Sequence, residues 1–83
     1  MITEKEIDYQ IKLIQEDIQY FLNYKNQLKK FSINNRMSIS QLSMNKIFIE
    51  IETLTLYIQK LKNEEKEYLK LLNNIYYGNE SDC

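Results

Sequence analysis

Apolar residues recur along most of this chain at alternating steps of four and three positions. In the first half the series is interrupted by one lysine and consists of Ile7, Ile11, Ile14, Ile18, Phe21, Lys25 and Leu28. In the second half it is interrupted by one glutamate and consists of Ile47, Ile51, Leu54, Ile58, Leu61, Glu65, Tyr68, Leu72 and Ile75. This spacing places every member on one side of a helix, at the a and d positions of a seven-residue repeat. The pattern predicts two long helices that pack against each other along their length.

Sequence signals also indicate where the first helix begins and ends. Thr3 and Glu6 form a T-x-x-E capping box, in which each side chain satisfies the free backbone N–H of the other residue. The apolar pattern continues to the dipeptide Asn34-Asn35, and asparagine tolerates the left-handed conformation that often ends a helix. The first helix is therefore predicted over about 4–33.

The second helix is expected to begin with a similar signal. Ser38 and Gln41 have the spacing of a capping box, and Met37 and Leu42 occupy the two positions of a hydrophobic staple around it. These signals and the apolar series predict a second helix over about 39–77.

The short connection between the helices determines the predicted fold. Long helices joined by a few residues become antiparallel neighbours, so we expect an all-α, coiled-coil-like helical hairpin that forms a single domain over 1–83. Gly78, the one glycine of the chain, is expected to end the second helix and to leave 79–83 as an acidic tail. The second helix is the longer one, and its C-terminal end should project beyond the start of the first.

Both predicted helices carry more apolar residues than one seam requires. Ile49 and Leu56 lie one repeat apart on the side opposite the seam, and a stripe of tyrosines runs beside the seam of the first helix. A hairpin cannot cover both sides of a helix, so such residues are expected at an interface with another chain. The predicted interface residues are Leu13, Tyr20, Tyr24, Phe48, Ile49, Leu56 and Tyr57. We expect a homodimer of hairpins that forms a four-helix bundle, and docking onto a different protein is the alternative.

The side chains available argue against catalysis and against a bound metal or cofactor. The 83 residues include no histidine and one cysteine, Cys83, so an internal disulfide is impossible and zinc would have only carboxylate ligands. Glu64 and Glu67 are three positions apart, but a di-metal site in a helical bundle ordinarily adds a histidine in Glu-x-x-His. We therefore expect no catalytic, cofactor-binding or metal-binding residues in this protein.

Two charged residues, Lys25 and Glu65, interrupt the apolar seams. A polar residue at such a position can set the register or the oligomeric state of a coiled coil. Alternatively, a long side chain can reach past the edge of the seam into water. Across the predicted hairpin, Glu65 is expected near Lys5.

The charge pattern favours a protein partner over nucleic acid or a membrane. The net charge is −1, and Lys29, Lys30 and Arg36 form the one loose basic cluster, which does not resemble the basic stripe of a nucleic-acid-binding surface. No apolar run is long enough to span a bilayer, and the residues that follow Met1 lack the features of a secretory signal. A cytoplasmic location is expected.

The composition also indicates the kind of genome that encodes the chain. It lacks alanine, valine, proline and tryptophan and is rich in Ile, Asn, Lys and Tyr. Because alanine is the best helix former, its absence from a helical chain indicates an AT-rich coding sequence, as in phages, plasmids and low-GC bacteria. We expect a small regulator or inhibitor of that origin, such as an antitoxin or an inhibitor of a host defence protein, which binds a larger protein target.

The alternative is a structural or export-associated subunit that acts through self-assembly. Tyr76-x-x-x-Glu80 resembles the Tyr-x-x-x-Asp/Glu segment that follows the second helix of the secreted WXG100 proteins, which are helical hairpins of similar size. This chain departs from their Trp-x-Gly turn, because it has no tryptophan and no glycine in the connection between the helices.

Overall fold

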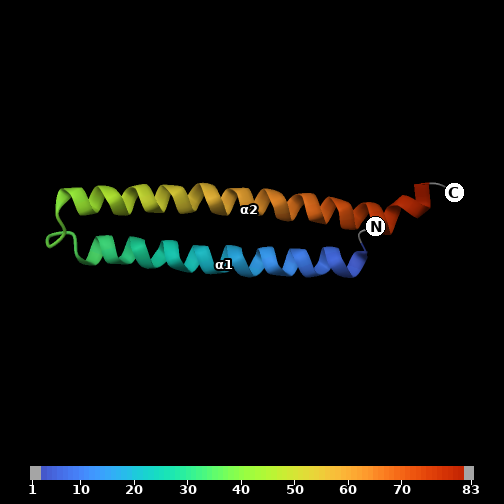
Figure 1. Cartoon of the computed structure of the whole chain (residues 1–83), viewed down its shortest axis with the longest axis horizontal. Coiled ribbons are helices and arrows are strands. Elements are labelled where there is room, and N and C mark those ends of the chain that lie inside the picture. The colour runs from blue at the N-terminus through green and yellow to red at the C-terminus, as the bar shows by residue number, and fades with distance from the viewer. Residues whose placement is uncertain (1–2, 82–83) are drawn as a thin grey trace.

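The fold is an antiparallel pair of long helices. The computed structural model describes residues 3–81, which form α1 (Glu4–Asn34) and α2 (Gln41–Ser81), joined by residues 35–40. The two helices lie side by side in a rod with principal extents of 66 × 18 × 16 Å, and α2 continues beyond the start of α1 (Figure 1). The predicted all-α helical hairpin is confirmed, and so is the projecting end of its second helix.

The predicted capping box opens α1. The Glu6 backbone N–H donates to the Thr3 hydroxyl oxygen at 3.2 Å, and the Thr3 N–H donates to the Glu6 carboxylate at 3.4 Å. Glu4 and Glu6 place negative charge in the first turn, where it favours the positive end of the helix dipole. Local sequence therefore specifies this end of the hairpin.

The other end of α1 closes by a different mechanism from the expected one. Asn35 has φ −113° and ψ 20°, so the expected left-handed conformation is absent, and no described residue has a positive φ. Instead, the Phe31 carbonyl accepts hydrogen bonds from the Asn35 backbone N–H at 3.0 Å and from its side-chain amide at 2.9 Å. Asparagine ends this helix through its amide group, since that group satisfies a carbonyl of the last turn.

The expected start of α2 is wrong by two residues. Ser40, and not Ser38, receives the Ser43 backbone N–H at 3.2 Å, and the helix begins at Gln41. The backbone N–H groups of Ser38 and Ile39 instead donate to the Asn35 carbonyl at 2.9 and 3.0 Å, which keeps both residues in the turn.

The predicted hydrophobic staple at this end is absent as well. Met37 is 96% exposed and Leu42 is also exposed, so the two side chains do not bury each other. The staple depended on Ser38 being the N-cap, and it is lost because the cap is Ser40.

The predicted end of α2 is also wrong. The helix passes through Gly78 and includes residues 79–81 of the predicted tail, while residues 82–83, with Cys83, lie outside the described part of the chain. A single glycine within a helix costs only about 1 kcal/mol relative to alanine, so glycine alone does not stop a helix.

The predicted seam forms the core of the hairpin. Its centre is a cluster of Ile14 and Ile18 from α1 with Ile58 and Leu61 from α2. Phe21, Leu22 and Tyr68 are partly buried against this cluster. Three more seam residues, Ile7, Ile11 and Leu54, are also buried. Burial therefore follows the a and d positions, as the spacing predicted.

The two charged seam residues form no ion pair with any side chain that the structure describes. Lys25 and Glu65 are half-buried and Lys5 is exposed, and among the described side chains, residues 3–76, the one ion pair joins Lys70 to Glu67 at 3.4 Å. The expected closeness of Glu65 and Lys5 thus gives no ion pair.

The corrected start of α2 can be tested with a pair of serine variants. Ser40→Ala removes the oxygen that accepts the Ser43 N–H, and we expect it to lower the free energy of unfolding by about 1 kcal/mol. Ser38→Ala, the matched control, should change it by less than about 0.5 kcal/mol. Urea unfolding followed by circular dichroism measures both values. A larger loss for Ser38→Ala than for Ser40→Ala would contradict the assignment.

Candidate interaction surface

All seven residues predicted for the interface are exposed on the hairpin. The highest exposed fractions among them are 68% for Leu56, 65% for Tyr20 and 64% for Ile49. Apolar side chains that a monomer leaves uncovered in this way are typical of interaction surfaces. The structure shows which of them lie on the same side.

Four of the seven predicted residues lie together on one flank of the hairpin. Leu13, Tyr20 and Tyr24 follow one another at heptad and four-residue spacing along α1, and Tyr57 of α2 joins them across the groove between the helices. Phe21 connects the two sides, because its ring packs edge-to-face on Tyr20 at a centroid distance of 5.3 Å and on Tyr57 at 5.0 Å. We call the surface formed by Leu13, Tyr20, Tyr24 and Tyr57 the tyrosine face.

Two other predicted residues belong to a separate row on α2. Ile49 and Leu56 lie one heptad apart on the side opposite the seam, and Leu42, one heptad earlier, continues the row. We call Leu42, Ile49 and Leu56 the outer row. Leu42 was missed in the sequence because it was assigned to the staple, although its spacing of seven from Ile49 was visible there.

The seventh residue, Phe48, lies on neither of these surfaces. It precedes Tyr57 by nine residues, about two and a half helical turns, so the two rings project from opposite flanks of α2. Phe48 lines a shallow depression of about 220 Å³ near the turn, together with Ser32, Ile33, Arg36 and Met44. The seven predicted residues therefore lie on three sides of the hairpin and not on one surface.

Two tyrosine hydroxyls connect the helices in a way that the sequence did not reveal. The Tyr24 hydroxyl donates to a Glu50 carboxylate oxygen at 2.5 Å, and the Tyr76 hydroxyl donates to the Glu4 carboxylate near the other end of the hairpin. Each hydrogen bond to a carboxylate raises the pKa of its tyrosine above the ordinary value of 10.0, and desolvation and the negative charge of the carboxylate add to the effect.

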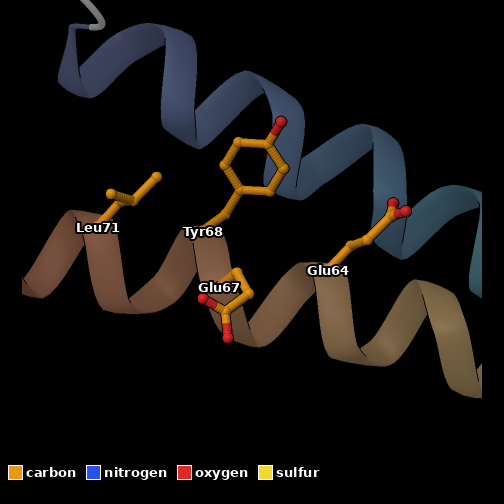
Figure 2. A pocket seen from close by; sticks show the side chains of 4 residues that line it. All are labelled: Glu64, Glu67, Tyr68 and Leu71. Carbon is orange, nitrogen blue, oxygen red and sulfur yellow. The ribbon is translucent and has the colours of Figure 1, made fainter.

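A depression lies toward the open end of α2. Its volume is about 500 Å³, and Figure 2 shows that Tyr68 and Glu64 of its lining point toward α1. Glu67 and Leu71 complete the lining, and Glu67 is paired with Lys70. Among the described residues, no group of three His, Cys, Asp or Glu side chains could hold a metal ion. The depression is thus an open groove beside the tyrosine face, with two carboxylates at its edge.

Comparisons with known proteins give no relative for this chain. No family model, no curated protein and no solved structure matches it. Within the described residues, neither helix has an apolar stretch that could cross a membrane.

The two tyrosine–carboxylate bonds predict a loss of stability at high pH. Because the pKa of Tyr24 and of Tyr76 is higher in the folded chain than the ordinary 10.0, their contribution is complete below about pH 10 and is lost as the pH rises through the folded-state values. We expect the change Tyr24→Phe with Tyr76→Phe to remove this part of the pH dependence. Urea unfolding at about pH 9 and about pH 11 measures it.

A tyrosine without such a bond provides the control. Tyr9 is exposed, and its hydroxyl makes no hydrogen bond to the side chains that the structure describes, residues 3–76, so Tyr9→Phe should leave the pH dependence unchanged. The assignment fails if the double variant loses as much stability between the two pH values as the wild-type chain does.

Proposed function

We propose that this chain is a non-enzymatic protein–protein interaction module, a small regulator or inhibitor that binds a larger protein target and associates with a second copy of itself. The observation that carries the proposal is the apolar surface outside the seam. The hairpin buries one side of each helix and leaves both the tyrosine face and the outer row exposed.

The energies involved support a binding role. Burial of a leucine or isoleucine side chain contributes roughly 1.5–3 kcal/mol, so the outer row alone could contribute several kcal/mol to an interface. Tyrosine is among the residues that most often dominate binding energy at interfaces. The tyrosine face contains three of them: Tyr20 and Tyr57 pack on Phe21, and Tyr24 is hydrogen-bonded to Glu50.

The positions of the two surfaces suit two different partners. The tyrosine face is built from both helices and follows the groove between them, so it has the shape that a second hairpin needs to complete a four-helix bundle. The outer row belongs to α2 alone and faces away from α1. A chain that dimerises through the first surface keeps the second one free for its target.

The chemistry of the described surface is consistent with binding. The two tyrosine hydroxyls that meet carboxylates connect one helix to the other, and the carboxylates at the depression lined by Tyr68 and Leu71 have no histidine or cysteine beside them. A positioned nucleophile, acid or base would be needed for catalysis.

The alternative role, a structural or export-associated subunit that acts through self-assembly, receives less support from the structure of the hairpin. Tyr76 would be the tyrosine of an export motif, yet its hydroxyl already meets Glu4 within the hairpin. We therefore treat self-assembly without a foreign target as an outcome of the test below and not as a second proposal.

The target-binding role can be tested with changes in the outer row. Ile49→Lys with Leu56→Lys should abolish stoichiometric capture of the target from the native host while it leaves the helix content unchanged. Thr55→Lys with Asn73→Lys adds the same charge at exposed polar positions on another side of α2 and should retain capture. Affinity capture with native mass spectrometry measures both partner and stoichiometry.

Two results would contradict the proposed function. Undiminished capture by the Ile49/Leu56 variant would remove the outer row from the target interface. Large assemblies that contain this chain alone would favour the structural alternative.

A further inference from the structure

The exposed charges on the α2 side of the tyrosine face are arranged symmetrically along the helix. On α2, four charged residues share the flank of Tyr57, because they lie three, seven or eleven positions from it: Lys46, Glu50, Lys60 and Glu64. Lys46 and Glu64 each lie nine residues from Thr55, and Glu50 and Lys60 each lie five residues from it. Each pair consists of a lysine and a glutamate, and its two members lie at equal distances from Thr55, one before it and one after it in the sequence.

The apolar residues of α1 have a similar symmetry about Leu22. Tyr20 and Tyr24 lie two residues on either side of it, and Leu13 and Phe31 lie nine residues on either side. All four project from the same stripe of the helix, which is the stripe of the tyrosine face.

Contacts between the helices bring these two centres to the same level of the rod. Phe21 packs on Tyr57, and Tyr24 bonds to Glu50, so the segment 21–24 of α1 lies opposite 50–57 of α2. Leu22 and Thr55 fall within these two segments. One axis across the face, perpendicular to the helices, can therefore pass through both centres.

We propose that a second copy of the hairpin docks on the tyrosine face in antiparallel orientation, with a two-fold axis at the level of Leu22 and Thr55. This inference rests on the self-association in the proposed function and specifies its geometry. This two-fold rotation places α1 of one copy against α1 of the other, and α2 of one copy against α2 of the other. Lys46 of one copy then meets Glu64 of the other, and Glu50 meets Lys60, each pair twice.

The apolar contacts of this arrangement are self-complementary too. Tyr20 of one copy meets Tyr24 of the other, and Leu13 meets Phe31, as a two-fold interface requires of any patch that binds itself. Residues 41–69 of α2 overlap, which is about 43 Å of helix. With the 18 Å width of the rod, each copy contributes roughly 800 Å², the size of a standard stable interface.

The charge of the turn end disfavours the parallel arrangement. Residues 25–50 contain five basic residues and one acidic residue, a net charge of +4, while residues 3–24 and 51–76 contain nine acidic and six basic residues, a net charge of −3. A parallel dimer would bring two turn ends of +4 side by side. The antiparallel dimer places each turn end against the negative part of its partner, which favours association.

A charge exchange tests the arrangement on the full chain. Lys46→Glu alone and Glu64→Lys alone each convert two attractive pairs into repulsive ones, so we expect each to raise the dimer dissociation constant roughly ten-fold at low salt. Combining both changes in one chain, or mixing the two single variants, restores both pairs and should restore the wild-type value. Sedimentation equilibrium measures the constants. Lys62→Glu, on the opposite flank of α2, should change the constant less than about two-fold.

The possible failures are distinguishable. If the wild-type chain dimerises but the combined variant does not regain the wild-type dissociation constant, the antiparallel geometry is wrong. Self-association itself then stands. A wild-type chain that stays monomeric at high micromolar concentration overturns both, while target binding through the outer row is still judged by its own variant.

Discussion

A single line of contact between two helices is the constraint on which the rest of this structure depends. Each helix of a hairpin has one neighbour, so each can bury one stripe of side chains, and here that stripe is the seam centred on Ile14, Ile18, Ile58 and Leu61. No second layer can cover another face. In a chain of 83 residues the buried area is small, and the folded monomer has a correspondingly small margin of stability. Any partner that binds the folded hairpin stabilises it by mass action.

The polar contacts between the helices complement this core where it is weakest. The buried seam residues run from Ile7 to Ile18 on α1 and from Leu54 to Leu61 on α2, whereas Ile51 is half-buried and Ile75, at the open end, is 39% exposed. The Tyr24–Glu50 and Tyr76–Glu4 hydrogen bonds lie on either side of the central cluster. Apolar side chains tolerate small sliding movements, but a hydrogen bond requires a donor and an acceptor at fixed positions. These two contacts therefore help to fix the register that brings Leu22 and Thr55 to one level.

The sequence predicts the features that depend on residues close together in the chain, and it leaves open those that depend on contacts between distant residues. The seam and the Thr3–Glu6 box depend on spacings of three, four and seven, and both were predicted correctly. The start of α2 was not, because the Asn35 carbonyl holds Ser38 and Ile39 in the turn. The tyrosine–carboxylate bonds join residues 26 and 72 positions apart, which no local pattern indicates.

The flank on which each candidate surface residue lies also follows from the repeat, although the prediction did not use it. In an antiparallel pair of right-handed helices, corresponding flanks of the two repeats lie side by side. Tyr24 and Tyr57 each directly precede a seam residue, whereas Phe48 directly follows one, so Tyr57 and not Phe48 joins the tyrosines of α1. The Phe21–Tyr57 contact agrees with this assignment, and Phe48 lies on the other side.

The two proposed interfaces also bear on each other. In the antiparallel dimer α2 lies on α2, so the outer rows of both copies face the same side of the bundle. Leu56 is one residue from the level of the two-fold axis, and the two Leu56 side chains therefore lie close together at the centre of that side. Ile49 and Leu42 extend the strip in both directions to a total length of about 39 Å. A target that contacts both halves of this strip binds the dimer more tightly than a single hairpin, so target binding and self-association favour each other by linkage.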